Sequence, residues 1–110
     1  MKPKTSQKKK KRKLITLSSV QKLIDVHIED LQKLSVKSLS VFGSVVRGEA
    51  TTASDIDFLV EFVRPVGMFD FLEVKYFLES LFKKEIDIAT PNALHPLLKD
   101  NIMKEAVRVA

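Results

Sequence analysis

The sequence predicts a single mixed α/β (α+β) domain. Three observations support this prediction: the chain has 110 residues, 45% of them are hydrophobic, and apolar patterns of strand and helix periodicity alternate along it. A chain of this length buries one small core and is too short for a second, substrate-binding domain. No apolar run approaches the roughly 20 residues of a membrane span, so an integral membrane protein is not expected.

A basic segment over residues 1–13 precedes the predicted domain, which covers residues 14–110. Eight of the nineteen lysines and arginines lie in this segment, which leaves eleven cations against fourteen anions in the domain. A block of like charges without apolar periodicity is expected to be disordered. A solvated tail is the simplest interpretation, and contact with nucleic acid or an acidic partner is the alternative. No signal-peptide pattern is recognised and cysteine is absent, so a cytoplasmic protein is expected.

The first half of the chain predicts a helix, a strand and a short helical turn. Ser18 and Gln21 form a capping-box pattern, and apolar side chains then recur at helical spacing, which predicts a helix over residues 18–34. A short apolar strand over residues 38–42 ends at a glycine. The next residues, 44–48, are expected to form the helical turn.

The second half predicts a strand, a helix, a further strand and a final helix. The strands cover residues 55–62 and 85–89, and apolar positions at helical period between residues 69 and 81 place a helix between them. Because Pro96 cannot lie deep within a helix, the final helix is expected to begin there and to run to about residue 107. The side chains expected to face inward from it are Leu98, Ile102 and Ala106.

Three aspartates on two predicted strands are candidate metal ligands. Asp55 and Asp57 alternate with Ile56 and Phe58, so both carboxylates project from one face while the apolar side chains enter the core. At a separation of about 4 Å two carboxylates repel by about 4 kcal/mol at an effective dielectric of about 20, and a divalent cation bound between them turns this into attraction. Asp87, in a strand that can pair beside theirs, is the candidate third ligand.

Gly43 and Ser44 are candidates for binding a nucleoside triphosphate together with Mg²⁺. A glycine at the end of a strand lets backbone N–H groups turn toward an anion, and the serine hydroxyl adds a donor for the β- and γ-phosphates. Arg47 either neutralises triphosphate charge or pairs with the carboxylates of the site to hold the loop. Ser54 either caps a turn or orients a metal-bound water, and the cap is favoured.

The Gly-Ser pair, ten intervening residues and the Asp-x-Asp strand together resemble the signature of the nucleotidyltransferase superfamily that includes DNA polymerase β. Among its branches the chain is similar to the minimal nucleotidyltransferases, which include the MntA-like antitoxins. Arg47 and Gly48 continue the resemblance to the G-S-x-A-R-G form, whereas Val46 stands where alanine is common. The resemblance covers about residues 18–107 and implies a polymerase-β-like fold, with a small mixed sheet and helices packed mainly on one side.

The resemblance also implies an activity and a partner. Family members use ATP with Mg²⁺, transfer AMP to a hydroxyl and release pyrophosphate. They carry a third aspartate on the strand after the helix that follows the Asp-x-Asp strand. Two metal ions would hold the attacking and leaving oxygens. MntA-like members adenylylate a tyrosine of a HEPN ribonuclease toxin, so an antitoxin of this kind is the leading interpretation. The candidate residues are Asp55, Asp57 and Asp87 for catalysis and metal binding, and Gly43, Ser44, Arg47 and Ser54 for nucleotide binding.

Two other functions stay open. The chain could transfer a nucleotide to a small hydroxylated molecule, as aminoglycoside nucleotidyltransferases do, although it is short for an enzyme that shapes its own acceptor pocket. It could also be an antitoxin that masks its partner by binding alone. Three mutually repelling carboxylates argue against the second function, since a pure binder does not need them.

Overall fold

The computed structural model describes residues 14–110, and the predicted basic tail over residues 1–13 lies outside the described residues. The elements in chain order are α1 (Leu17–Asp25), α2 (Ile28–Lys33), β1 (Val36–Phe42), α3 (Ser44–Arg47), β2 (Ile56–Phe62), α4 (Met68–Phe82), β3 (Ile86–Ala89), the 3-10 helix η1 (Pro91–Ala93), α5 (Pro96–Glu105) and β4 (Val107–Arg108). In this described part, no helix has both the length and the apolar character that crossing a membrane requires.

The strands form one mixed sheet in the order β3-β2-β1-β4. β1 is antiparallel to both of its neighbours, β2 and β4, whereas β2 and β3 are parallel. Parallel neighbours need a crossover connection, and α4 supplies it between β2 and β3. The crossover brings the first residues of β2 and β3 to the same end of the sheet, where the predicted carboxylates lie.

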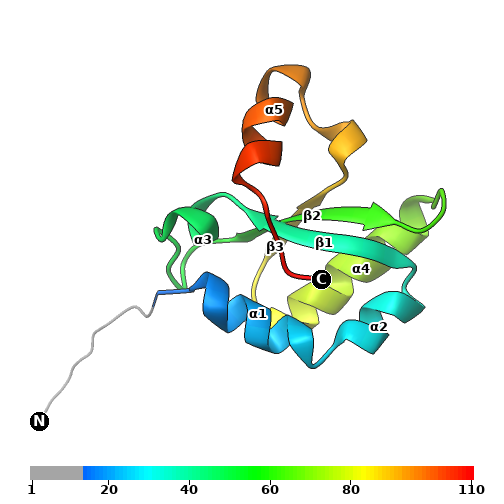
Figure 1. Ribbon diagram of the computed structural model, residues 1–110. Helices are drawn as coiled ribbons and strands as arrows, with labels where there is room; N and C mark the ends of the chain where they lie inside the picture. Colours follow the sequence, from blue (N-terminus) through cyan, green and yellow to red (C-terminus); the bar gives the residue numbers. More distant parts are fainter. Residues whose placement is uncertain (1–13) are drawn as a thin grey trace, which may run out of the picture.

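Helices α1, α2 and α4 pack on one face of the sheet, and α5 stands on the other side (Figure 1). The apolar faces of the three helices and the sheet form the core. Its largest fully buried side chains are Val20, Ile24, Leu31, Leu39, Val41, Ile56, Phe58, Val60, Val74, Leu78 and Ile86. The mixed α/β class and the packing of helices mainly on one side are therefore confirmed.

The single helix predicted over residues 18–34 is wrong in two respects. A turn at Val26 and His27 divides it into α1 and α2, and the imidazole of His27 contacts Phe77 of α4 edge-on, with ring centroids 5.9 Å apart. The capping box also lies earlier than expected, because Thr16 and Ser19 exchange backbone and side-chain hydrogen bonds at the start of α1. A contact with a distant helix thus accompanies a break that helical periodicity did not predict.

The end of the chain also differs from the prediction. The final helix stops at Glu105, and the next residues form β4, where Val107 pairs with Val41. No residue of α5 is buried, and Leu98, which was expected to face inward, is 55% exposed. Valines favour strands, and pairing with β1 buries Val109, so the C-terminal residues join the sheet and do not extend the helix.

Candidate active site

The parallel pairing of β2 with β3 places two of the predicted carboxylates side by side. Asp57 pairs in register with Asp87, and Ile56 pairs with Ile86. The isoleucines are almost completely buried, so the aspartates share the opposite face of the sheet. Asp55 immediately precedes β2 and is exposed, as is Asp87. The structure therefore brings the three predicted carboxylates to one end of the sheet.

The electrostatic surroundings of Asp57 disfavour its ionised form. Partial burial raises the pKa of Asp57 to about 6, with further contributions from the charge of Asp87, from a hydrogen bond shared with Asp87 and from the charge of Asp55. Arg47 opposes these effects by lowering the pKa of Asp57, but it does not cancel them. An excess of negative charge is therefore concentrated around Asp57, as expected of a site that receives a cation.

Carboxylate oxygens are the donors that Mg²⁺ prefers, so the chemistry of this cluster fits the ion that the sequence predicts. Asp87 and Asp55 are both near enough for their charges to act on Asp57. Within residues 14–110, however, no three or more acidic or histidine side chains are already arranged closely enough to hold a metal ion. The residues present thus match Mg²⁺ in type, and they would have to approach one another more closely to hold the ion.

Gly43 lies directly against Asp57. Its backbone has φ +78° and ψ −144°, a region that is essentially restricted to glycine. A Cβ at this position would overlap Asp57 Oδ2 and would lie 3.3 Å from Asp57 Cγ. The glycine is therefore required both by the backbone conformation and by the close approach of the carboxylate.

The residues after Gly43 form the four-residue helix α3, which begins at the half-buried Ser44 and ends at Arg47. Arg47 Nε lies 3.0 Å from Glu49 Oε1, and Arg47 Nη1 lies 2.9 Å from Glu105 Oε2. Of the two roles predicted for this arginine, the geometry shows a pairing that holds the loop, but the partners are these glutamates and not the aspartates of the cluster. Contact of Arg47 with a triphosphate stays a prediction.

Glu105 is the residue of this region that the sequence did not reveal. Its Oε1 accepts a hydrogen bond from the Gly43 N–H at 2.6 Å while its Oε2 pairs with Arg47. The bond from Gly43, together with the charge and hydrogen bonding of Arg47, holds the pKa of Glu105 below its usual value. Helical periodicity did not identify Glu105 as a residue of the site, because only the tertiary structure brings the end of α5 to the Gly-Ser loop.

Ser54 closes the turn that leads into β2. Its Oγ accepts a hydrogen bond from the Thr51 N–H at 3.0 Å, and its own N–H donates to the Thr51 carbonyl at 2.9 Å. This is the turn-capping role favoured from the sequence. A contact between Ser54 and a nucleotide stays a prediction.

Replacing Ser54 with alanine is expected to lower the free energy of unfolding by about 1 kcal/mol, because the Thr51 N–H loses its side-chain acceptor. Urea denaturation measures this loss. The affinity for an ATP analogue, measured in the same preparation, is expected to stay within about twofold of wild type. A large loss of affinity without a loss of stability would instead assign Ser54 to nucleotide binding.

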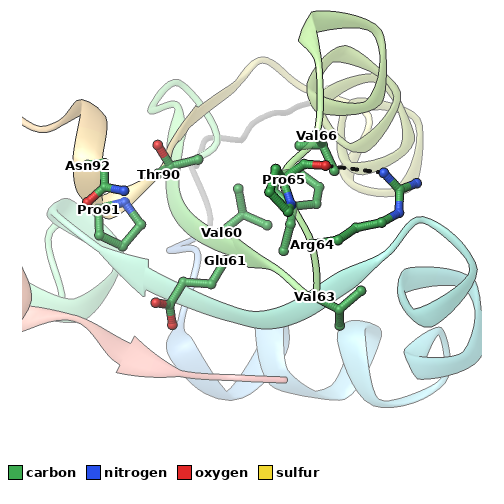
Figure 2. Close-up of a pocket in the computed structure, with 10 residues that line it drawn as sticks. Val60, Glu61, Val63, Arg64, Pro65, Val66, Thr90, Pro91 and Asn92 are labelled. Carbon is green, nitrogen blue, oxygen red and sulfur yellow. Dashed lines mark hydrogen bonds between the residues drawn. The ribbon is translucent and has the colours of Figure 1, made fainter.

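A separate pocket of about 500 Å³ lies at the far end of β2, next to η1 (Figure 2). It is lined by Val60 to Val66 and by Thr90, Pro91 and Asn92. Figure 2 shows Arg64 on one side of it, with its guanidinium bonded to the Pro65 carbonyl at 3.3 Å. None of the predicted site residues lines this pocket, so it is distinct from the carboxylate cluster.

Residues 24–109 match a protein family described as the nucleotidyltransferase domain. Among curated proteins, the chain is 49% identical over 79 residues to a Methanocaldococcus jannaschii protein provisionally named a protein adenylyltransferase, covering 72% of this chain and 85% of the relative. It is 31% identical over 97 residues to the protein adenylyltransferase MntA of Thermococcus cleftensis, covering 87% of this chain and 98% of MntA.

Solved structures have the same fold. A structure provisionally described as a minimal nucleotidyltransferase superposes with a TM-score of 0.72 at 30% identity, covering 84% of this chain and 94% of its own. The complex of a tri-AMPylated Shewanella oneidensis HEPN toxin with its MNT antitoxin matches with a TM-score of 0.59 at 17% identity, covering 82% and 71%. The mixed sheet and its helices are thus those of the polymerase-β-like minimal nucleotidyltransferases.

Proposed function

Because the chain belongs to the nucleotidyltransferase domain family, we propose that it transfers AMP from ATP to a hydroxyl of a HEPN ribonuclease toxin and thereby neutralises the toxin. The observation that carries this proposal is the pairing of Asp57 with Asp87 directly beside Gly43. Two adjacent carboxylates suit the cations that accompany a triphosphate, and the Gly-Ser turn beside them suits its phosphate oxygens.

Two relatives support a protein as the acceptor. The Thermococcus cleftensis MntA, of which this chain covers 98%, is named a protein adenylyltransferase. The Shewanella oneidensis MNT antitoxin was solved with a HEPN toxin that carries AMP groups. By analogy the acceptor here is a HEPN protein, with a tyrosine hydroxyl as the modified group. ATP as the substrate implies a cytoplasmic protein.

The three aspartates and the Gly-Ser turn each have a role in this reaction. Asp55, Asp57 and Asp87 would hold two Mg²⁺ ions, which neutralise phosphate charge and favour displacement at the α-phosphorus. The Gly43–Ser44 turn binds the β- and γ-phosphates, with the Ser44 hydroxyl as a donor. An Asp87 carboxylate oxygen accepts the proton of the acceptor hydroxyl while the hydroxyl oxygen bonds to the α-phosphorus. The α–β phosphoanhydride bond breaks at the same time, and pyrophosphate leaves.

The test is incubation of the chain with its cognate HEPN protein, Mg²⁺ and ATP labelled in the α-phosphate. We expect label on the HEPN protein, no label from ATP labelled in the γ-phosphate, and a parallel loss of ribonuclease activity. Asp55→Ala is expected to reduce the transfer at least about 100-fold, because a ligand that stabilises charge on the transferring phosphate is lost. Asp100→Ala, which removes an exposed carboxylate of α5, is the matched control and is expected to leave the transfer unchanged.

Two results would contradict the proposal. One is the absence of transfer from α-labelled ATP to the HEPN protein with the wild-type chain. The other is full neutralisation of the ribonuclease by the triple variant Asp55→Ala, Asp57→Ala and Asp87→Ala, since binding alone would then account for antitoxin activity.

A further inference from the structure

The carboxylate of Glu105 holds both ends of the segment that contains the Gly-Ser turn. One oxygen accepts the Gly43 N–H at 2.6 Å and the other pairs with Arg47 Nη1 at 2.9 Å. Gly43 precedes α3 and Arg47 ends it, so a single side chain spans the whole helix. Gly43 is buried and the Glu105 side chain is only 26% exposed, so water competes weakly for the bond between them.

The strand register explains why a side chain takes this position. Leu39 exchanges backbone hydrogen bonds with Val109 and Ala110, and Val41 pairs with Val107, so these alternate residues of β1 direct their N–H groups toward β4. Two residues further on, the Gly43 N–H points to the same edge. The same register places residue 105 opposite Gly43, where the backbone of Glu105 is still helical. Its carboxylate therefore replaces the backbone acceptor that a longer β4 would supply.

The hydrogen bond between Glu105 and Gly43 also affects the carboxylate cluster, because it fixes the residue against which Asp57 packs. Gly43 packs against the Asp57 carboxylate so closely that no Cβ fits between them, and Glu105 holds Gly43 from the opposite edge of β1. Without Glu105 the buried Gly43 N–H would have no acceptor from α5, and Arg47 would keep only Glu49. The turn would then be free to move away from Asp57.

We propose that Glu105 is a positioning residue, which fixes the Gly43–Ser44 turn against Asp57 so that the turn meets the β- and γ-phosphates of ATP. This inference rests on the nucleotide-binding role given to the turn in the proposed function. Glu105 touches neither nucleotide nor acceptor, and it acts through the Gly43 N–H and the Arg47 guanidinium.

The test compares the binding of AMP-PNP and of AMP, both with Mg²⁺, by NMR titration of the full chain. Glu105→Ala is expected to weaken AMP-PNP binding about 10- to 100-fold, the loss expected for one charge-assisted hydrogen bond. AMP lacks the two phosphates that the turn meets, so its affinity is expected to change less than about twofold. Glu105→Gln keeps an acceptor for the Gly43 N–H but loses the charge, so its affinity for AMP-PNP is expected to lie between those of wild type and Glu105→Ala.

Glu49→Gln is the matched control, because it removes the other carboxylate from Arg47 without affecting Gly43. It is expected to change AMP-PNP affinity less than about twofold. In Glu105→Ala alone the Gly43 amide proton is expected to exchange faster with solvent, which reports directly on the lost bond.

Three outcomes would overturn the positioning role. The first is an AMP-PNP affinity of Glu105→Ala within twofold of wild type. The second is a fall in AMP affinity as large as that in AMP-PNP affinity, which would indicate general damage to the fold. The third is a loss of AMP-PNP affinity in Glu49→Gln as large as in Glu105→Ala. Failure of the proposed function is read separately, from the absence of AMP transfer to the HEPN protein by the wild-type chain, whereas the positioning role is read from the AMP-PNP and AMP affinities of the variants.

Discussion

Replacing Asp57 with asparagine is expected to abolish AMP transfer while making the metal-free protein more stable at pH 7. Asparagine has the same shape but no charge, so it removes the repulsion from Asp87 and Asp55 and can donate a hydrogen bond to Asp87. The activity should fall about 1,000-fold or more, because a metal ligand at the centre of the cluster is lost. Transfer of label from ATP measures the first effect, and thermal unfolding in EDTA measures the second.

The sign of the stability effect follows from the raised pKa of Asp57. The folded protein binds this proton with a pKa of about 6 against 3.8 for an unperturbed carboxyl, so the folded state loses stability as the pH rises through this interval. The shift would correspond to about 3 kcal/mol for a buried group, and solvent screening of this half-buried side chain reduces the expected gain to about 1 kcal/mol. A gain of this size raises Tm by about 5 °C at pH 7.

The stabilisation should disappear near pH 4, where the wild-type carboxyl is protonated in the folded state. Asp100→Asn, at an exposed position of α5, should leave Tm unchanged at both pH values and controls for the loss of charge alone. Added Mg²⁺ should raise the Tm of wild type and not that of Asp57→Asn. An Asp57→Asn protein that is less stable than wild type at pH 7 in EDTA would show that the carboxylate cluster is not strained in the absence of metal.

Replacing Gly43 with alanine is expected to have the second large effect. Alanine is strained at φ +78° and ψ −144°, and its Cβ would overlap the Asp57 carboxylate, so either the turn or the aspartate must move. We expect a loss of about 3 kcal/mol in the free energy of unfolding and at least about 100-fold weaker binding of AMP-PNP. Urea denaturation and NMR titration measure the two losses.

Gly48→Ala separates the two causes. Gly48 follows α3 with φ +75°, but no atom lies within 4 Å of the position its Cβ would take. Alanine there should cost only the left-handed conformation, about 1 kcal/mol, and should leave AMP-PNP affinity within about threefold of wild type. Equal losses of affinity in both variants would mean that backbone strain at α3, and not the contact with Asp57, controls the turn.

Local patterns in the chain were sufficient to predict β1, β2 and β3, the helix between β2 and β3, and the face on which the carboxylates lie, but not β4. Alternation of Asp57 with Ile56 and Phe58 specifies which side chains leave the core, because successive residues of a strand point to opposite faces. The strand of Asp87 is expected from the sequence to pair beside that of Asp57, and the structure makes this pairing parallel, with α4 as the crossover. That pairing places Asp87 beside Asp57.

Contacts between residues that are distant in the sequence determined the features of the fold and the site that local patterns did not predict. Glu105 reaches Gly43 across 62 positions of the chain, and the break between α1 and α2 is accompanied by the contact of His27 with Phe77. Neither contact can be predicted from hydrophobic periodicity, because that periodicity depends only on residues within the same helix or strand. The sequence therefore predicts the Gly-Ser turn and the aspartates opposite it. The hydrogen bond that holds the turn in place depends on the register of a two-residue strand, which only the folded sheet defines.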